Sequence, residues 1–514
     1  MVLKTSRKTS RKTSRLKPTV IFLAWSAIFA ILYAQSPLYL SNQNTYFLHG
    51  LAQAGLGNLQ ADWLANTADP TPVFSGLVFL TYTLTHTGIL FYGYYALLMG
   101  VYLYSVAGMM ELLFRLGRSR AQKIFFYALF LGLHSAALRF ALSRFLDADA
   151  AFLFEGGLGN QRLLGQVFQP SVFGVFLVLS LYLFLRAKNW CAIPPLALAV
   201  YFHPTYLTAA GLMTLAYLWA LWRDNRSLRA IFVFGLMTLG AVLPVFLYTL
   251  LVFGPTRPEI FQQAQEILIH VRIPHHAIVA QWFNWTSLAQ LGLILGGLAV
   301  TRKTALFPLY ALMSAGAFLL SVLQVMTGNA TLALLFPWRI SVILVPLGAV
   351  SLAAVATQKI FSAFRLAEKA ALPLAGTLIG LLMLTGLIRF QVESARQRAL
   401  PERALMSFVA EHRSAGQVFV TPPKMQNFRL ATGAPVFVDF KSNPYRNADV
   451  LEWYRRITRV NDFYSHPASC QAAEELLVFA HASRIVLPIE QAPIVCDNLA
   501  VFYRDSTFVV FASE

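Results

Sequence analysis

Long apolar runs recur along the chain from Pro18 to Leu387, and short polar stretches separate them. A helix needs about 20 apolar residues to cross the roughly 30 Å hydrocarbon core of a bilayer, and many of these runs approach or reach that length. The pattern predicts about eleven membrane-spanning helices. Their expected positions are Pro18–Ser36, Gly88–Phe114, Lys123–Leu142, Gln169–Leu185, Trp190–Phe202, Thr205–Trp222, Ala230–Phe253, Val279–Val300, Thr304–Val325, Leu335–Thr357 and Ala370–Leu387.

Composition agrees with this pattern. Hydrophobic residues make up 57% of the 514 residues and charged residues only 12%, and the mean hydropathy is +0.58. A soluble protein cannot bury that much apolar surface, so the chain is predicted to be a polytopic α-helical membrane protein. Its three cysteines form no CxxC pair, which disfavours a metal or redox centre.

Lysine and arginine gather in alternate loops between the predicted spans. Loops rich in these residues face the cytoplasm, which predicts a cytoplasmic N-terminus. These loops contain Arg115, Arg118, Arg120, Lys123, Arg186, Lys188, Arg223, Arg226, Arg229, Arg302, Lys303, Lys359, Arg365 and Lys369. The net charge of +18 therefore reflects membrane orientation and not nucleic-acid binding. Residues 1–17 hold three copies of KTSR and are predicted to be a disordered cytoplasmic tail.

The predicted membrane domain covers residues 18–388, and its first outer loop covers residues 37–87. Two segments of this loop, Tyr46–Leu56 and the stretch that begins at Pro72, are expected to form short helices at the membrane surface. Counting the second as a span would place the basic residues from Arg115 to Lys123 outside, against the positive-inside rule.

The composition changes at Arg389, where alternating strand and helix patterns begin. QVFVTPP, APVFVDF, RIVLP, LAVFYRD and TFVVFASE are predicted strands, and VLEWYRRITRV and CQAAEELLVFAHAS are predicted helices. Residues 389–514 are therefore expected to form a small α/β domain, outside the cytoplasm by the count of spans. An oxidising compartment would permit a disulfide between Cys470 and Cys496, and two buried free thiols are an equal alternative.

The predicted outer loops hold the candidate functional residues. Ionisable groups at the edge of hydrocarbon are costly unless they pair or line a wet cavity, so they are candidates for a binding or catalytic site. The loops contain Asn44, Asp62, Asp69, Asp147, Asp149, Glu155, Gln161, Arg162, Arg272, His275, His276 and Arg339.

Structural alternatives stand beside these roles. Asp62 has an equal chance of serving a turn, and Asp69, followed by Pro70, favours a turn and helix cap. His275 and His276 are adjacent and lack a carboxylate at helical spacing, so a structural or substrate contact is favoured over a metal. Arg339 fits a phosphate contact or an interfacial anchor equally well.

Nucleotide hydrolysis and covalent catalysis lose support, because the sequence contains no P-loop, nucleophile elbow or HExxH motif. The remaining pattern combines outer acids, outer cations and a capping domain. It fits an enzyme whose carboxylate deprotonates a hydroxyl while cations hold a phosphate leaving group.

This layout resembles the GT-C superfamily of integral membrane glycosyltransferases. The segments QNTYFLHGL, DWLANTADPTPVFS, RIPHHA, FPWRIS, FRLATG, VDFKSNPY and EWYRRI are similar to a group of bacterial, including cyanobacterial, membrane proteins with GT-C-like architecture and no assigned reaction. The resemblance covers most of the chain. It implies an inverting transfer of a sugar from a polyprenyl-phosphate-linked donor to a cell-envelope glycan or glycoprotein, on the outer face of a bacterial inner membrane.

The resemblance also implies roles for individual residues. Asp62 is the expected catalytic base and Asp69 the second choice. Arg339, with Arg272, is expected to hold the lipid phosphate, and Asp147 and Asp149 lie where many members have a second acidic element, which leaves room for a divalent cation such as Mg²⁺ or Mn²⁺. Substrate contacts are expected from Asn44, Gln161, Arg162, His275 and His276. The chain departs from several GT-C families directly after the first span, where Asn42, Gln43 and Asn44 replace an acid.

Two other functions remain open. A transporter or flippase of an amphipathic substrate predicts repeated halves and charges at the middle of the membrane. A non-catalytic membrane scaffold predicts no outer cavity joining Asp62, Asp149 and Arg339.

Overall fold

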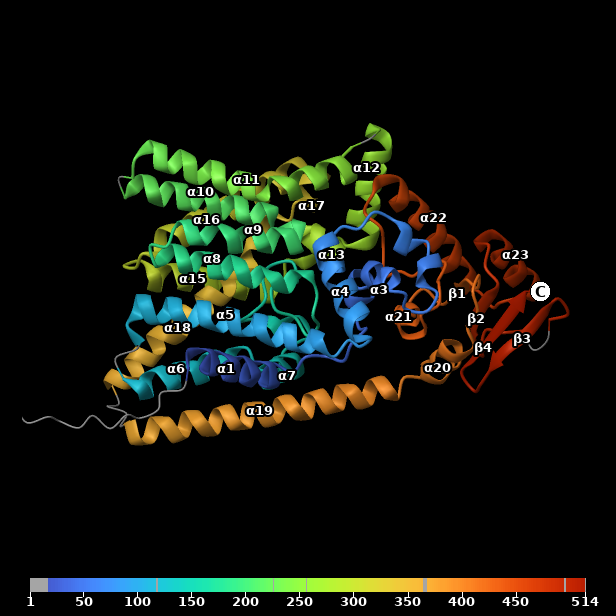
Figure 1. The fold of residues 1–514 in the computed structure, drawn as a ribbon, viewed down its shortest axis with the longest axis horizontal. Coiled ribbons are helices and arrows are strands. Elements are labelled where there is room, and N and C mark those ends of the chain that lie inside the picture. Colours follow the sequence, from blue (N-terminus) through green and yellow to red (C-terminus); the bar gives the residue numbers. More distant parts are fainter. Residues whose placement is uncertain are drawn as a thin grey trace, which may run out of the picture.

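Most helices between Pro18 and Arg398 run side by side in a bundle, and the C-terminal part of the chain lies beyond one end of it (Figure 1). This computed structural model describes residues 17–116, 119–224, 226–255, 257–363, 368–493 and 496–513. The predicted basic tail, apart from Lys17, lies outside the described residues.

Each predicted span position contains a helix. The bundle consists of α1 (Pro18–Tyr33), α5 (Leu90–Phe114), α6 (Arg120–Leu133), α7 (Ala136–Phe145), α8 (Val175–Leu185), α9 (Ile193–Phe202), α10 (Leu207–Arg223), α11 (Leu228–Phe253), α15 (Trp285–Thr301), α16 (Leu306–Thr327), α18 (Ser341–Ala363) and α19 (Glu368–Arg398). In the described part of the chain, five helices are long and apolar enough to cross a membrane, or six if α6 and α7, bent by 46°, form one span.

Several of the other helices are shorter than a full crossing, and the sequence explains where they begin. Pro170 starts a 3-10 turn ahead of α8, and the Asn284 side chain accepts a hydrogen bond from the Ser287 N–H to cap α15. Ser135 caps α7 in the same way, by accepting a bond from the Leu138 N–H at 3.1 Å directly after α6 ends. Local capping therefore shortens helices whose apolar runs look longer.

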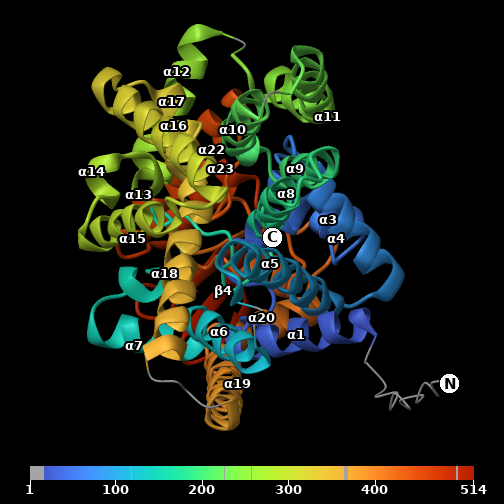
Figure 2. The ribbon, with the colours of Figure 1, turned by 90° about the vertical axis from the view of Figure 1, so that its left-hand side faces the viewer.

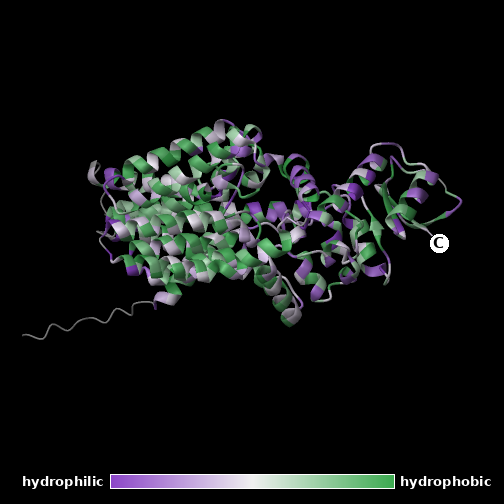
Figure 3. Cartoon of the chain, turned by 90° about the horizontal axis from the view of Figure 1, so that it is seen from above, coloured by the Kyte–Doolittle hydropathy of each residue, from purple (hydrophilic) through white to green (hydrophobic). Residues whose placement is uncertain are grey.

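Large apolar side chains also cover the outside of the bundle. On α11, Leu236 is 56% exposed and Leu251 is 80% exposed. Figure 3 shows hydrophobic residues along the whole bundle and more hydrophilic residues over the C-terminal part. Exposed apolar surface on this scale requires lipid as its solvent, so the chain is a polytopic helical membrane protein, as predicted.

The helix α19 lies on the outside of the bundle and continues toward the C-terminal domain (Figures 1 and 2). It packs on α6 and α1. The predicted domain boundary at residue 389 falls within this helix, so one continuous element connects the two parts of the chain.

The first outer loop contains α2 (Gln43–Tyr46), α3 (Leu48–Gln53) and α4 (Pro72–Thr85), with 3-10 turns at Leu59–Ala61 and Leu64–Asn66. Figure 1 and Figure 2 show α4 crossing the end of the bundle rather than extending it. The structure thus has both expected short helices, and their position at the membrane surface stays a prediction. Shorter helices also occur in later loops: α12 (Pro258–Glu266), α13 (Pro274–Ala277), α14 (Val279–Trp282) and α17 (Ala330–Leu334).

The C-terminal domain consists of α20 (Arg403–His412), β1 (Phe419–Val420), α21 (Phe428–Thr432), α22 (Asn447–Tyr464), α23 (Cys470–Ala480), β2 (Arg484–Pro488), β3 (Leu499–Arg504) and β4 (Phe508–Ser513). Its sheet has the order β1-β2-β4-β3, in which β1 and β2 are parallel and the other pairs antiparallel. A disulfide joins Cys470 to Cys496, which decides the alternative that the sequence left open.

The segment APVFVDF is not a strand, contrary to the prediction. Phe437 donates a backbone hydrogen bond to Phe419 O, and Pro435 has no N–H to donate. The Val436 N–H bonds to the side chain of Asp62 instead of to a neighbouring strand. A hydrogen bond to the first outer loop therefore takes the place of a strand-to-strand hydrogen bond in this segment.

Candidate functional site

Asp62, the expected base, is completely buried between the first outer loop and the C-terminal domain. Its Oδ1 accepts a hydrogen bond from the Leu64 N–H at 2.9 Å, and its Oδ2 accepts bonds from Arg429 Nε at 2.7 Å and the Val436 N–H at 2.8 Å. Arg429 also donates to Asp439. A substrate hydroxyl could reach Asp62 only by displacing one of these donors. The contacts of Asp62 are therefore structural, and they join the first outer loop to the C-terminal domain.

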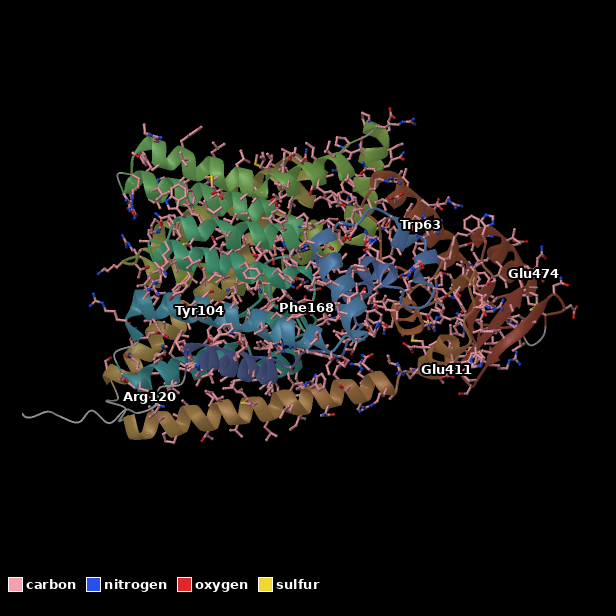
Figure 4. The ribbon with its side chains drawn as sticks, in the orientation of Figure 1. Trp63, Tyr104, Arg120, Phe168, Glu411 and Glu474 are labelled. Carbon is pink, nitrogen blue, oxygen red and sulfur yellow. A yellow bond between two sulfur atoms is a disulfide. The ribbon has the colours of Figure 1, made fainter. Side chains whose placement is uncertain are left out.

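Other contacts join the same two parts of the chain. Asn44, an expected substrate contact, donates from Nδ2 to Asn427 Oδ1 at 2.9 Å. The Arg456 guanidinium lies 4.0 Å from the ring centre of Trp63. Figure 4 shows Trp63 at the place where the first outer loop meets the C-terminal domain. The domain is therefore fastened to the outer end of the bundle by polar contacts.

Asp69 lies beside a small pocket between the first outer loop and the C-terminal domain. Its Oδ1 accepts a hydrogen bond from the Thr71 N–H at 2.8 Å, which is the expected turn ahead of α4. Its Oδ2 makes no hydrogen bond with the described residues. The pocket is lined by Thr45, Tyr46, His49, Leu64, Thr67, Ala68, Asp69, Pro70, Thr71, Asn443 and Pro444. Asp69 thus lines the pocket while one of its carboxylate oxygens is held by a backbone N–H.

A tight turn between Gly156 and Arg162 presents the second outer loop. The Gly157 N–H donates to Gln161 O at 2.9 Å, and Gly159 has φ +67°. A Cβ at Gly159 would lie 2.7 Å from Trp338 Nε1, so only glycine fits this close approach. The turn is consequently held against the start of α18, with Gln161 and Arg162 at its end.

Arg339 stands directly before α18 and is 9% exposed. Its Nη1 donates to Gln161 Oε1 at 3.3 Å, and its guanidinium lies 4.9 Å from the ring centre of Tyr206. The ring of Tyr206 lies 5.4 Å from that of His203, which lies 6.0 Å from that of Tyr46. Arg339 therefore connects the second outer loop to the pocket beside Asp69.

Arg272 and Lys441 come from opposite sides of the site. Arg272 donates from Nη2 to the backbone carbonyl of Lys441. Burial lowers the pKa of Lys441 to about 8, and the charges of Arg272 and Arg162 act in the same direction, against that of Asp439. The protonated form of Lys441 is thus opposed by the charges of two arginines.

The two adjacent histidines have different surroundings. His276 Nδ1 lies 2.6 Å from Gly159 O, so the ring donates from this nitrogen. Burial, followed by the neighbouring His275, lowers the pKa of His276 to about 3. His275 is exposed. The pair has one structural member and one surface member, which matches the structural alternative better than a metal site.

Glu155 is a buried acid deeper in the same region. It is 3% exposed and forms an ion pair with Arg139 at 3.1 Å. Its Oε2 has no hydrogen-bond partner among the described residues. Burial raises the pKa of Glu155 to about 7, although Arg139 acts in the opposite direction.

We define the outer cation cluster as Arg162, Arg272, Arg339 and Lys441. Its members share neighbours: Arg339 and Arg272 both act on the pKa of Tyr46, and Arg162 acts on that of Lys441. Several buried donors here have no partner in the part of the chain that the structure describes, namely Gln161 Nε2, Arg272 Nε, Trp282 Nε1, Trp338 Nε1 and Arg339 Nε. Buried cations and unpaired donors are costly, and a bound anion would offset both costs.

Asp147 and Asp149 contact the start of α15, and the charge of Asp149 acts on Arg162 of the cluster. Asp147 accepts hydrogen bonds from the Trp285 Nε1–H and the Ala150 N–H, and Asp149 accepts one from Asn284 at 2.9 Å. Within the described residues, no three His, Cys, Asp or Glu side chains gather in a way that could hold a metal. One or two carboxylates can hold Mg²⁺ together with waters and a substrate phosphate, so a divalent cation at Asp147 and Asp149 stays a prediction.

Asp62, Asp149 and Arg339 therefore have separate sets of partners. The structure instead brings together Arg162, Arg272 and Arg339, which were expected, with Lys441 and Tyr46, which were not. In the motif VDFKSNPY, Lys441 follows Asp439 by two residues in the predicted outer domain, and this charge is the sequence signal that could have identified it. Glu155 was among the candidates of the second loop without an assigned role.

Comparison with known proteins finds one matching family model and a set of similar solved structures. Residues 401–460 match a family model described as "Domain of unknown function (DUF6798)", and no curated protein matches. The chain is similar to two crystal structures of ArnT from Cupriavidus metallidurans, one in the apo state (12% identity, TM-score 0.47) and one bound to undecaprenyl phosphate (13%, TM-score 0.44). Each match covers 96% of this chain and 97% of the other. At these TM-scores the likeness carries no assignment of family, substrate or reaction.

Proposed function

We propose that this protein is a membrane glycosyltransferase that transfers a sugar from a polyprenyl-phosphate-linked donor to an envelope glycan or glycoprotein, on the outer face of a bacterial inner membrane. The observation that carries the proposal is the outer cation cluster. It offers positive charge and unpaired donors at the end of an apolar bundle, which is what a lipid with a phosphate headgroup would bind.

The arginines of the cluster suit a phosphate. The guanidinium fork of arginine matches two phosphate oxygens, and Arg339 donates to Gln161 while its buried Nε has no partner among the described residues. The same holds for Arg272 Nε within the described part of the chain. Arg162 stands in the turn that Gly159 holds in place. These contacts support a phosphate that lies between the second and third outer loops.

Asp69 is the proposed base, because it lines the pocket and its Oδ2 makes no hydrogen bond with the described residues. Tyr46 lines this pocket and lies within electrostatic reach of Arg339 and Arg272. An acceptor hydroxyl in the pocket would thus lie beside the donor phosphate. Its oxygen attacks the anomeric carbon, its proton passes to Asp69, and the bond from that carbon to the phosphate oxygen breaks. The arginines stabilise the charge that develops on the departing polyprenyl phosphate.

Two observations support the outer side of the membrane for this site. The C-terminal domain contains a disulfide, which persists in oxidising compartments. The loops that join α8 to α9, α10 to α11 and α15 to α16 carry the basic residues and lie at the opposite end of the bundle (Figure 1). Both fit a bundle whose basic end faces the cytoplasm.

Binding of undecaprenyl phosphate to the purified protein in nanodiscs tests the proposal, with tryptophan fluorescence as the readout. Wild type should bind, and Arg339→Gln should weaken binding at least about tenfold, because a charge-assisted hydrogen bond is lost. Arg446→Gln is the matched control, since Arg446 is exposed and its side chain, among the described residues, bonds Asp449 alone. Absence of binding, or equal affinity in Arg339→Gln, would overturn the proposal.

Transfer itself can be followed with polyprenyl-phosphate sugars extracted from host membranes. Asp69→Asn should release no free polyprenyl phosphate while it binds undecaprenyl phosphate as wild type does, since an amide cannot accept the proton. A flippase would move the lipid-linked sugar without releasing polyprenyl phosphate in any variant. Release by Asp69→Asn at the wild-type rate would exclude Asp69 as the base.

A further inference from the structure

A buried ion-pair triad lies at the junction of the C-terminal domain and the first outer loop. Arg429 is 2% exposed and donates from Nε to Asp62 Oδ2 at 2.7 Å and from Nη1 to Asp439. Both carboxylates are themselves buried. Removing three charged groups from water is costly, so a buried triad is weak evidence for a role in stability alone.

The triad holds one end of a short turn. Asp439 Oδ1 accepts a hydrogen bond from the Ser442 N–H at 2.7 Å, and its backbone carbonyl accepts one from Trp453 Nε1 at 3.1 Å. Lys441 lies within this turn. Its carbonyl accepts bonds from Arg272 and, at 3.4 Å, from the Thr45 hydroxyl. The turn is consequently fixed from the domain, the first loop and the third loop together.

This turn brings a lysine to a place where other charges oppose it. The charges of Arg272 and Arg162, which come from two other loops, oppose the charge of Lys441, and Lys441 in turn acts against the protonation of His275. Asp439 is the acid that favours its charge, and Asp439 is already paired with Arg429. A fold that holds a cation against like charges gains from an anion placed among them.

We propose that Lys441, supplied by the C-terminal domain, binds the donor phosphate together with Arg272 and Arg162, and that Arg429 positions it through Asp439. The inference rests on the proposed function and extends it: the C-terminal domain completes the phosphate site. Asp62 then contributes as the partner that holds Arg429 in place. The proposed site combines residues from the loops of the bundle with Lys441, which lies in an irregular segment of the C-terminal domain.

Titration of undecaprenyl phosphate binding in nanodiscs between pH 6.5 and 9.5, about the pKa of Lys441, tests the inference. Wild-type affinity should fall as pH rises through about 8, where Lys441 loses its proton. Lys441→Ala should bind about tenfold more weakly at neutral pH, because one charged hydrogen bond is lost, and should lack the fall near pH 8. Lys441→Arg should keep the affinity and also lack the fall, because arginine stays protonated throughout this range.

Control and positioning variants complete the experiment. Lys424→Ala removes an exposed lysine from the same domain and should behave as wild type. Arg429→Gln should weaken binding while the thermal midpoint of the bundle, followed on the same sample, shows whether the protein is folded. Arg456→Gln removes a different contact between the domain and Trp63 and should leave the pH profile unchanged.

The outcomes separate this inference from the proposed function. If wild type binds and Arg339→Gln weakens binding while Lys441→Ala matches wild type at every pH, the inference is wrong and the proposed function stands. A fall near pH 8 that persists in Lys441→Arg also contradicts it. If wild type does not bind undecaprenyl phosphate at all, both fail.

Discussion

At the scale of single residues, two aspartates of one loop have opposite surroundings. Asp62 is enclosed by Arg429 and backbone N–H groups, whereas Asp69 lines a pocket. The residue type is the same, and the difference is that the C-terminal domain brings donors to Asp62, whereas Asp69 accepts from Thr71 of its own loop. The contacts of Asp62 therefore stabilise the fold, and Asp69 is the proposed base.

Substitution of these aspartates should separate the two roles. Asp62→Asn is expected to lower the free energy of unfolding by about 3 kcal/mol, because it takes one partner from a buried ion pair. Asp69→Asn should leave the thermal midpoint in detergent close to that of wild type and abolish transfer. A stable Asp62→Asn protein without transfer activity would return the catalytic role to Asp62.

Glu155 predicts a pH dependence of stability. Burial raises its pKa from 4.5 to about 7. The folded state therefore binds the proton more tightly than the unfolded chain, so this contribution to stability is complete below about pH 4.5 and is lost as pH rises through about 7. The thermal midpoint of wild type should fall between pH 5 and pH 8, and that of Glu155→Gln should fall less. Parallel curves for the two proteins would contradict the buried position of this carboxyl group.

At the scale of elements, the glycine turn before α18 determines where the second outer loop lies. Gly159 meets two requirements, a positive φ and contact with the Trp338 ring. Gly328, at the end of α16, has a similar φ of +61° but open space around it. Comparing the two glycines therefore distinguishes the cost of a positive φ from the cost of steric contact with Trp338.

Alanine substitution at both glycines measures that difference. Gly328→Ala should cost about 1 kcal/mol of stability, from the left-handed backbone alone. Gly159→Ala should cost more and should also weaken undecaprenyl phosphate binding, because the turn that carries Gln161 and Arg162 must move away from Trp338. Equal losses of stability, with unchanged binding, would show that the turn does not position the site.

At the scale of the whole molecule, one end of the bundle is basic and the other carries the disulfide-bonded domain. Cys191 is a free, exposed cysteine in the loop between α8 and α9, near Arg186 and Lys188. The other two cysteines are joined to each other. The native chain therefore contains a single reactive thiol for mapping its orientation.

Labelling with a membrane-impermeant maleimide checks the proposed orientation. In intact spheroplasts, Cys191 should react only after the membrane is permeabilised, because its loop is predicted to face the cytoplasm. In a Cys191→Ser background, Lys424→Cys should react without permeabilisation. The reverse pattern would invert the topology and place the cation cluster on the cytoplasmic side.

Sequence alone determined the features that depend on composition and local pattern. Apolar runs located the helices because lipid demands about 20 apolar residues per crossing, and strand and helix periodicity located the C-terminal domain. Pro72 and the polar residues around it marked α4 as separate from the spans. Arg162, Arg272 and Arg339 could be chosen because charge is scarce beside hydrocarbon.

Only the tertiary structure decided which of those residues act together. Asp62 and Arg429 are far apart in the chain, and their ion pair, which removes Asp62 from the pocket, arises from the docking of one domain on another. Lys441 joins arginines from two distant loops for the same reason. The disulfide likewise needed Cys470 and Cys496 to be adjacent in space, with Cα atoms 5.5 Å apart. Local patterns indicate whether a residue faces lipid, water or the protein interior. A site depends on distances between segments that are far apart in the chain, and tertiary packing sets those distances.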